Sequence, residues 1–228
     1  MTPPDETGPP NGQPDYPPSD RSRLRRVPNR AHYDRETVHA VLDAGLQCAV
    51  GYVFDGMPYV TWTAYWRQGE RLYWHGSSAS RMIKRVKGGM PVCFSVGLLD
   101  GVVFARSGFH HSFNYRSVVA YGTAHEVTDS QEKLAALKAF TERLAPGRWE
   151  ELRAPTQQEM KATAVLSMPL QEVAAKVRQG GPKDDAEDMD APVWAGHVPV
   201  GLTSGEPVTD PDSRAATPPP YTRDLPLG

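Results

Sequence analysis

The sequence predicts a mainly β protein, an antiparallel β-barrel with α-helical insertions at its connections. Short apolar runs recur through the middle of the chain, and tight-turn signals such as Asp55-Gly56 and Asp100-Gly101 separate them. Helical periodicity is confined to a few segments, so the regular strand–helix alternation of a parallel sheet is absent. Many short strands with few helices are typical of an antiparallel sheet that closes on itself.

Length and composition indicate one domain with tails. The chain has 228 residues, of which 39% are hydrophobic, and its 22 prolines gather towards the two ends. We expect a disordered Pro-rich tail at 1–28, a barrel domain at 29–201 and a second disordered Pro-rich tail at 202–228.

Charge, hydropathy and cysteine content indicate the kinds of partner and the compartment to expect. The formal net charge of −2 gives no reason to expect nucleic acid or an anionic membrane surface as a partner. No signal-peptide pattern opens the chain, and no apolar run approaches the ~20 residues needed to cross a bilayer. A cytoplasmic protein is therefore expected, with Cys48 and Cys93 as reduced thiols inside apolar runs.

The first elements expected are a helix and three strands. Asp34 is placed to cap a helix that ends at Gly45, and strands are predicted at 47–55, 58–67 and 71–74. Alternate residues of the second strand face opposite ways, so we expect one face to pack inward and the other to contact another part of the protein or another molecule. A subunit interface would suit this second face.

The remaining elements follow from caps, turns and apolar runs. Asp100-Gly101 predicts a hairpin turn, and Gly122 predicts a bulge in the strand that contains it. The other expected elements are a helix after His75, strands at 91–99, 102–106 and 115–127, a helix capped at 128–130 that runs to Leu144, a capping box at 156–159, strands at 164–168 and 172–178, an acidic loop at 184–190 and a segment at 194–200 that docks on the barrel.

The stretch from Arg71 to Arg85 (RLYWHGSSASRMIKR) indicates an anion site. A strand ends at His75-Gly76, and serines then lead into the basic first turn of a helix. Free backbone N–H groups, hydroxyls and guanidinium groups all favour negative charge at such a place. The expected phosphate contacts are Ser78, Ser80, Arg81 and Lys84. A capped surface helix with a solvated basic face is the alternative, and Arg85 is assigned to that solvated face.

A second group of polar side chains lies between His110 and Ser117 (HHSFNYRS). Neighbouring histidines point apart on an extended chain, and no Cys or carboxylate lies at ligand spacing nearby, so no metal site is predicted. Motifs for a P-loop, a dinucleotide fold and a nucleophile elbow are missing. The group remains a loop of donors suited to a phosphate or to the carbonyl edge of a heterocycle.

Two runs of the sequence resemble a known family. LYWHGSSASRMIKRVKGGMPVCFSV, followed by LLDGVVFARSGFHHSFNYRSVVAYGTAHEV, resembles the pyridoxamine 5′-phosphate oxidase-like branch of the FMN-binding split barrels, which includes the nitroimidazole-resistance (Nim-type) flavoproteins. The resemblance covers about residues 30–200. It implies a six-stranded, Greek-key-like split barrel with peripheral helices, which forms a homodimer with FMN at the interface.

The resemblance also implies roles for individual residues. Ser80, Arg81 and Lys84 would hold the FMN phosphate, and His75 matches a histidine placed near the flavin, which makes it the expected catalytic residue. The residues expected to line the flavin ring are Val60, Thr61, Trp62 and Thr63, and those expected to complete the site are Asn114, Tyr115, Arg116 and Ser117.

The implied function is that of an FMN-dependent oxidoreductase. It would pass electrons from NADH or NADPH to a small acceptor such as a nitroaromatic compound. One alternative is a non-catalytic module of the same fold that binds flavin, deazaflavin or haem, with His75, His110 or His111 as axial candidates. Another is an interaction protein whose barrel only carries the two tails. The vitamin B6 oxidase activity is not implied, because the Arg-Leu-Ala-Pro element at 143–146 lies mid-chain and not near the C-terminus.

Overall fold

The computed structural model describes residues 14–215, 217–223 and 225–227. Its strands are β1 (Ala31–His32), β2 (Gln47–Phe54), β3 (Met57–Gln68), β4 (Arg71–Ser77), β5 (Gly88–Phe104), β6 (Ser112–Glu126), β7 (Thr163–Pro169), β8 (Glu172–Arg178) and β9 (Gly196–Pro199). They form one nine-stranded sheet in the order β1-β8-β6-β7-β4-β3-β2-β5-β9. Because β5 also pairs with β6, the strands β2 to β7 close into a barrel, as predicted.

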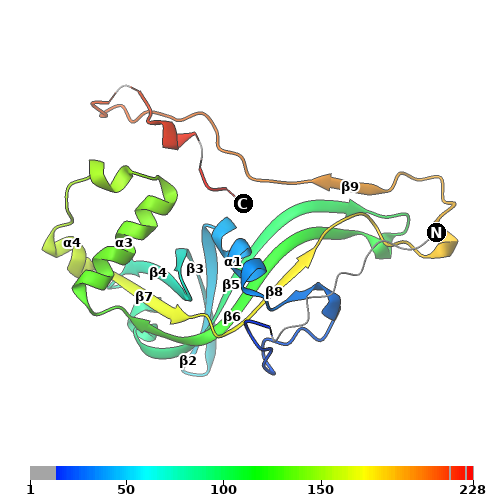
Figure 1. The fold of residues 1–228 in the computed structure, drawn as a ribbon, viewed down its shortest axis with the longest axis horizontal. Helices are drawn as coiled ribbons and strands as arrows, with labels where there is room; N and C mark the ends of the chain where they lie inside the picture. The colour runs from blue at the N-terminus through cyan, green and yellow to red at the C-terminus, as the bar shows by residue number, and fades with distance from the viewer. Residues whose placement is uncertain (1–13, 216, 224, 228) are drawn as a thin grey trace.

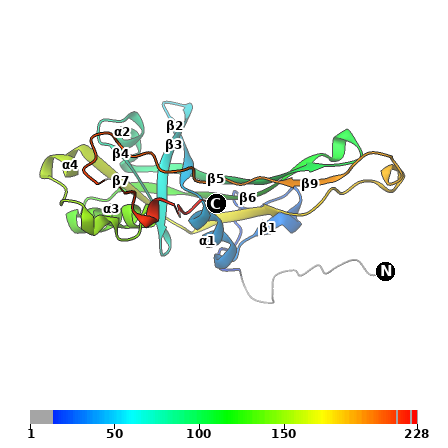
Figure 2. The same ribbon diagram turned by 90° about the horizontal axis from the view of Figure 1, so that it is seen from above.

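Helices connect and cover the barrel (Figures 1 and 2). The α-helices are α1 (Arg35–Ala44), α2 (Arg81–Val86), α3 (Ser130–Leu144) and α4 (Gln157–Ala162). The short 3₁₀ helices are η1 (Pro28–Arg30), η2 (Gly108–His110), η3 (Arg148–Glu151), η4 (Ala186–Asp188) and η5 (Pro220–Thr222). The predicted caps are confirmed, since Asp34 and Asp129 accept from backbone N–H groups in the first turn, and Thr156 and Glu159 form a capping box. Among the described residues, no helix combines the length and the apolarity that a membrane span requires.

The two Asp-Gly pairs behave differently. Asp55 and Gly56 have φ angles of 50° and 73°, as the turn of the β2–β3 hairpin requires. The hairpin predicted at Asp100-Gly101 is wrong, because β5 runs through it without a break and the register against β6 shifts between Leu99 and Gly101. The pair forms a β-bulge, and a Cβ atom on Gly101 would lie 2.9 Å from the carbonyl oxygen of Val198 on β9.

The bulge predicted at Gly122 is also wrong. The β5–β6 register continues unshifted from Thr123 to Tyr121 through this glycine. A Cβ atom at position 122 would lie 2.8 Å from the side chain of Met168 on β7. The glycine therefore reflects close packing of β6 against β7 and not an irregular backbone.

Hydrophobic side chains form two cores. The larger core fills the barrel interior and includes Tyr65, Trp74 and Phe94. The smaller core lies on the outer side of β3 and β4, where Trp66 and Tyr73 pack beneath Phe140 of α3. Successive residues of a strand thus serve different cores, as the two-residue period requires.

The two described ends of the chain contact the barrel and the helix η3, respectively. Residues 14–28, expected to belong to a disordered tail, pack against it: Tyr16 is buried in the larger core, and its hydroxyl donates to Glu70 Oε2 at 2.6 Å. Ser19 and Arg21 both bond to the carboxylate of Glu172. Residues 1–13 of the expected tail lie outside the described residues. Near the C-terminus, Tyr221 donates to Glu151 Oε2 at 2.9 Å.

A long arm projects from the barrel (Figures 1 and 2). We define the arm as residues 97–116 of the β5–β6 ribbon together with residues 178–200, which run along the ribbon and around its tip. Polar contacts hold these parts together. Arg178 is buried and bonds to Asn114, and Arg106 donates through its backbone N–H and its guanidinium group to Asp184, whose side chain is only 1% exposed.

Candidate functional site

The turn from β4 into α2 forms a basic pocket. The hydroxyl of Ser80 caps α2 by accepting from the backbone N–H of Ile83 at 3.3 Å. The N–H of Ser78 donates to the carbonyl of Ala162 at 2.8 Å, which ties the turn to α4. Arg81, Lys84 and Arg85 follow on the exposed side and, with Ala79, line a pocket of about 380 Å³. Of the four predicted phosphate contacts, Arg81 and Lys84 line this pocket, whereas Ser78 and Ser80 do not.

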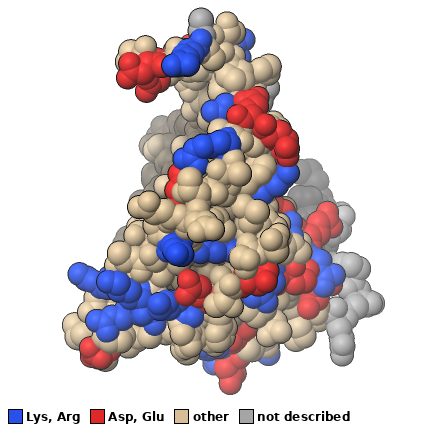
Figure 3. Space-filling view, turned by 90° about the vertical axis from the view of Figure 1, so that its left-hand side faces the viewer, with Lys and Arg blue, Asp and Glu red and all other residues tan. Residues whose placement is uncertain are grey.

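Aromatic rings on the β2–β3 hairpin orient two of these cations. The guanidinium carbon of Arg85 lies 3.2 Å from the ring centre of Phe54, and that of Arg81 lies 5.8 Å from the ring centre of Tyr59. Arg85 was assigned to a solvated face, and it is exposed, but it stacks on a ring and also lines the pocket. Figure 3 shows Lys and Arg side chains gathered at the lower left of this end of the molecule.

Next to the pocket, one face of β3 is uncovered. Val60 and Trp62 are 67% and 68% exposed and point away from the barrel interior. Thr61 and Thr63, on the opposite face, are half-buried. The Thr63 hydroxyl donates to the backbone carbonyl of His75 at 3.1 Å, which links this part of β3 to β4. The residues predicted to line a flavin ring begin directly after Tyr59, the residue on which Arg81 of the pocket stacks, and two of them offer large apolar surfaces.

His75 packs against a residue of α3 and a residue of β3. Its ring centre is 4.9 Å from that of Phe140 and 5.8 Å from that of Trp66. Its Nδ1 atom is buried and has no hydrogen-bond partner among the described residues. Burial lowers the pKa of the imidazole below its ordinary value. A neutral ring without a protein partner can act as a metal ligand or as a hydrogen-bonding group for a bound molecule.

The second predicted group lies far from the pocket within one chain. Gly122 of β6 pairs in register with Val92 of β5, Val92 pairs with Tyr52 of β2, and Tyr52 pairs with Tyr59 of β3. Because Tyr59 stacks against Arg81, Gly122 lies at the level of the pocket along the strands. Asn114 is eight residues further along β6 (122 − 114), which corresponds to about 26 Å at the usual rise per residue. The structure therefore does not bring residues 114–117 together with α2 in a single chain.

Of the four side chains at 114–117, three already have hydrogen-bond or ion-pair partners within the chain. Asn114 is buried and bonded to Arg178, and its amide also donates to the carbonyl of Gly180 at 3.1 Å. Arg116 pairs with Asp100 at 2.7 Å, and the Ser117 hydroxyl donates to the carbonyl of Lys176 at 3.3 Å. These contacts stabilise the arm. Tyr115 pairs in register with the exposed Leu99 and is half-buried.

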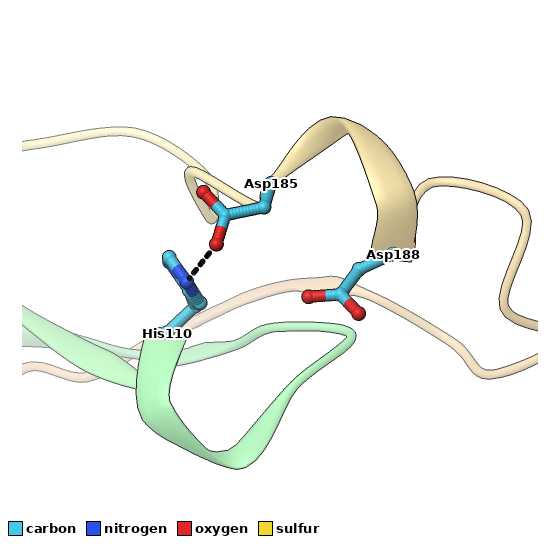
Figure 4. Close-up of side chains that lie close together, drawn as sticks. All are labelled: His110, Asp185 and Asp188. Atoms are coloured by element: carbon cyan, nitrogen blue, oxygen red, sulfur yellow. Dashed lines mark hydrogen bonds and ion pairs between the residues drawn. The ribbon is translucent and has the colours of Figure 1, made fainter.

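A group of possible metal ligands lies at the tip of the arm (Figure 4). His110 Nε2 is 3.2 Å from Asp185 Oδ2, and His110, Asp185 and Asp188 offer ligand atoms that all lie within 4.8 Å of one another. This group was not predicted from the sequence, because the carboxylates lie in the acidic 184–190 loop, far from His110 along the chain. His111 is separate from it and bonds through Nδ1 to the carbonyl of Ser107 at 3.0 Å.

A second pocket, of about 570 Å³, lies between the start of α3 and α4. No motif in the sequence pointed to it. Lys133, on its wall, donates to the carbonyl of Met160 at 2.7 Å and so joins the two helices. The lining residues are Glu126, Val127, Thr128, Ser130, Lys133, Pro155, Gln157, Met160 and Lys161.

Comparisons with known proteins identify the family. The family model described as pyridoxamine 5′-phosphate oxidase matches residues 34–177. No curated protein matches the sequence. Among solved structures, the flavocytochrome Anf3 from Azotobacter vinelandii is 42% identical, with 93% of this chain and 100% of that chain covered and a TM-score of 0.88.

Two further structures are similar to different degrees. The FAD and heme binding protein from Mycobacterium smegmatis is 38% identical, with 86% of this chain and 97% of that chain covered and a TM-score of 0.82. A protein from Bacteroides thetaiotaomicron named for 5-nitroimidazole antibiotic resistance is 18% identical, with 64% of this chain and 86% of that chain covered and a TM-score of 0.54, which shows a shared fold alone. Since the family model matches more than half of the chain, the protein belongs to the pyridoxamine 5′-phosphate oxidase family and has its split-barrel fold.

Proposed function

We propose that the protein is a flavin-binding redox protein that also binds haem, and that it passes electrons from a reduced nicotinamide to a small acceptor. The observation that carries the proposal is the basic pocket of α2 beside the uncovered apolar face of β3. Two relatives at 42% and 38% identity support it, since one is named a flavocytochrome and the other a FAD and heme binding protein.

The residues around α2 are suited to a flavin. A phosphate group carries negative charge and several acceptor oxygens, and Arg81 and Lys84 offer cationic donors at the mouth of the pocket. Val60 and Trp62 offer the apolar surface that a planar ring system requires, and they would exclude water from one side of it. The bound flavin would supply the electron-transfer chemistry, while these side chains hold and orient it.

One of the two relatives favours FAD over the FMN that the resemblance implied. That relative is named for FAD, and it is aligned over 86% of this chain. Arg85 adds a third cation to the pocket, so a second phosphate group could be bound beside the first. We therefore propose FAD as the flavin, with FMN as the competing outcome of the test below.

His75 is the most suitable of the three axial candidates for haem. Iron is bound by the lone pair of a neutral imidazole nitrogen, and burial keeps the pKa of His75 low and its ring neutral. Nδ1 of His75 is an orphaned buried polar atom, whereas His110 contacts Asp185 and His111 bonds to the carbonyl of Ser107. The packing of Phe140 and Trp66 against the His75 ring would hold it in one orientation.

A homodimer is part of the proposal. In one chain the β3 face beside the pocket is open to solvent on its outer side, and residues 114–117 lie far from it. A second copy would cover Val60 and Trp62 and shield the flavin from water.

The first experiment identifies the cofactors. We expect freshly purified protein to show both flavin absorption and a Soret band, and mass spectrometry of the small molecules released on denaturation to give the mass of FAD. The mass of FMN would select FMN instead. A colourless protein that neither quenches added flavin fluorescence nor takes up hemin would refute the function.

Point variants test the roles of two residues. We expect Arg81→Ala to weaken flavin binding by about tenfold or more, because a charge-assisted hydrogen bond is lost. Lys87→Ala is the matched control, since Lys87 is an exposed cation directly after α2 that does not line the pocket. We expect His75→Gln, but not His111→Gln, to shift or abolish the Soret band. If Arg81→Ala and Lys87→Ala weaken flavin binding equally, Arg81 does not have the proposed role. If His75→Gln and His111→Gln change the Soret band equally, His75 does not have its proposed role.

Turnover separates an enzyme from a binding module. We expect NADH or NADPH to reduce the bound flavin and a nitroaromatic acceptor to reoxidise it, both followed by flavin absorbance under anaerobic conditions. Flavin that binds tightly but is reduced by neither nicotinamide would favour a non-catalytic binding or sensing module of the same fold.

A further inference from the structure

Three metal-ligating side chains from two distant segments meet at the tip of the arm. His110 ends η2, whereas Asp185 and Asp188 lie at the two ends of η4, and 75 residues separate His110 from Asp185 along the chain. Their ligand atoms all lie within 4.8 Å of one another. Within the described ranges, no other group of three or more His, Cys, Asp or Glu side chains brings its ligand atoms so close. Figure 4 shows the two carboxylates on one segment and the imidazole ring on the other.

The backbone of each segment presents these side chains. The N–H of Asp188 donates to the carbonyl of Asp185 at 3.0 Å, which closes one turn of 3₁₀ helix. Side chains three residues apart eclipse one another in such a helix, so both carboxylates lie on the same side of the loop. On the facing segment, the N–H of His110 donates to the carbonyl of Ser107 at 3.2 Å, and Nδ1 of His111 bonds to the same carbonyl at 3.0 Å. The two turns are therefore closed before any ion binds.

A buried ion pair anchors the acidic loop beside this group. The side chain of Asp184 is only 1% exposed, and it accepts from the backbone N–H of Arg106 at 2.8 Å and from its guanidinium group at 2.9 Å. These bonds fix the start of the 184–190 loop against the end of β5. Ligands held by such supporting contacts need less ordering when a metal binds.

Negative charge at the tip is not balanced by the chain. Arg106 is engaged by Asp184, so it does not neutralise the next two carboxylates. In the part of the chain that the structure describes, Asp185 has His110 as its ion-pair partner, and the Asp188 carboxylate has none. Two carboxylates at this separation repel each other, and a divalent cation between them would offset the repulsion.

The donor set indicates which class of ion suits the group. An imidazole nitrogen is a good ligand for transition metals such as Zn²⁺, whereas Mg²⁺ and Ca²⁺ favour sites built from oxygen alone. Zinc–nitrogen and zinc–oxygen bonds of about 2.1 Å place neighbouring ligand atoms about 3.4 Å apart in a tetrahedral site. His110 Nε2 and Asp185 Oδ2 are 3.2 Å apart, close to this value. Rotation of the Asp188 side chain would bring the third ligand to bonding distance.

We infer that the tip of the arm binds a divalent transition-metal ion, with Zn²⁺ as the best match, through His110 Nε2 and one carboxylate oxygen each of Asp185 and Asp188. Three protein ligands leave a fourth position for water. The ion would join η2 to the acidic loop and close the end of the arm. This gives the 184–190 loop a role, and it departs from the prediction, made from the sequence, that there is no metal site.

The metal site is separate from the proposed flavin site. Ser112, the first residue of β6, is ten residues from Gly122 at the level of the basic pocket (122 − 112), which corresponds to about 33 Å along the strand. The inference therefore does not depend on the proposed function, and zinc binding can be measured whether or not flavin and haem are bound.

Metal titration of the whole chain tests the inference. Untagged protein is dialysed against a chelator, and Zn²⁺ is then added, with binding followed by titration calorimetry and the zinc content measured by mass spectrometry. We expect one Zn²⁺ per chain with a dissociation constant of about 10 μM or lower. An excess of Mg²⁺ or Ca²⁺ of about a hundredfold should not displace it, because these ions disfavour the imidazole ligand. No saturable binding, or zinc that Mg²⁺ displaces readily, would overturn the inference.

Ligand variants with matched controls locate the site. We expect His110→Gln and Asp188→Asn each to weaken Zn²⁺ binding by about tenfold or more, because a ligand is lost. His111→Gln and Asp190→Asn are the controls, since they change a neighbouring histidine and an exposed carboxylate of the same loop that lie outside the group. Wild-type affinity in His110→Gln or Asp188→Asn, or an equal loss in the controls, would overturn the assignment of the ligands.

Hydrogen exchange shows whether the ion joins the two segments. Binding to the folded state slows local opening, so we expect Zn²⁺ to slow amide exchange in residues 107–111 and 184–190 together. Exchange in β2 and β3 should not change, and His110→Gln should show no slowing in either segment. Slowing confined to one of the two segments, or slowing elsewhere alone, would overturn the inference.

Discussion

Arg116 on β6 donates from Nη2 to Oδ1 of Asp100 at 2.7 Å, and its Nε lies 3.0 Å from Oδ2, so the two side chains form a bidentate pair across the bulge of β5. The resemblance assigned Arg116 to a flavin site, yet its guanidinium group is engaged by its own chain. The pair raises the pKa of Arg116, mainly through the hydrogen bond with Asp100. Asp100 is thereby held at the point where the sequence predicted a turn.

The first prediction concerns this pair. We expect Arg116→Ala to lower the free energy of unfolding by about 1 kcal/mol, since both side chains are about a quarter exposed and the pair is partly screened. Asp100→Ala should have a similar effect, and the double variant should lose little more than either single variant. Urea denaturation of the wild type, both single variants and the double variant measures the coupling. Losses that simply add would show that the pair does not act as a unit.

Arg143 of α3 holds the end of α1. Its Nη2 donates to the carbonyls of Leu42 and Asp43 at 3.2 and 2.9 Å and also bonds to that of Gly45, while Nη1 donates to the carbonyl of Tyr65 at 3.3 Å. The last carbonyls of a helix lack partners within the helix, and a cation satisfies them well. The Arg-Leu-Ala-Pro element at 143–146 therefore begins with a residue that has a structural role here.

The second prediction follows from these bonds. We expect Arg143→Ala to lower the free energy of unfolding by about 2–3 kcal/mol, because several carbonyls lose a charged donor together. Arg143→Lys should recover part of this loss, since an ammonium group can still donate to some of the carbonyls. Arg153→Ala is the control, because Arg153 is an exposed arginine that bonds only to its own segment. A midpoint of unfolding that moves equally for Arg143→Ala and the control would contradict the role.

The third prediction concerns pH. His39 contacts the hydroxyl of the buried Tyr16 at 2.9 Å, and burial, with Arg67 nearby, lowers the pKa of His39 below 6.5. The unfolded chain therefore takes up a proton at higher pH than the folded chain does. Stability should be fully present above about pH 6.5 and should fall as the pH drops through the folded pKa.

Glu70, in the same network, adds a second step at lower pH. Hydrogen bonding from Tyr16, together with His39 and Arg35, outweighs the effect of burial and holds its pKa below 4.5. Its contribution is therefore present above about pH 4.5 and is lost below it. Thermal unfolding measured over this pH range should show both steps, and His39→Gln should remove the upper one alone. A midpoint that changes equally with pH in the wild type and in His39→Gln would refute the assignment.

Much of the fold could be predicted because its signals are local. The Asp34 and Asp129 caps, the 156–159 capping box and the Asp55-Gly56 turn each depend on a few neighbouring residues, and all are present as predicted. The bulge at Asp100 and the packing of Gly122 against Met168 could not be predicted, because they depend on partners far along the chain. An Asp-Gly pair permits a turn, but the strands beside it decide whether one forms.

The candidate site likewise combines local features, which could be predicted from the sequence, with contacts between distant segments, which could not. The cations of α2 were predicted to lie together because they are neighbours in one short segment, and the exposed face of β3 followed from its alternation. The packing of His75 against Phe140, the engagement of Asn114 by Arg178 and the grouping of His110 with Asp185 join segments far apart in the chain. No local pattern reports such contacts.

By itself, therefore, the sequence determined the closed antiparallel barrel, its caps and the basic turn at Arg81, because period, capping chemistry and turn chemistry act over a few residues. The tertiary structure decided that β5 continues past Asp100 into the arm, and that Asn114 lies about 26 Å along β6 from the level of the pocket. The physical reason is that pairing of distant strands and burial of Arg178 set where each local element ends.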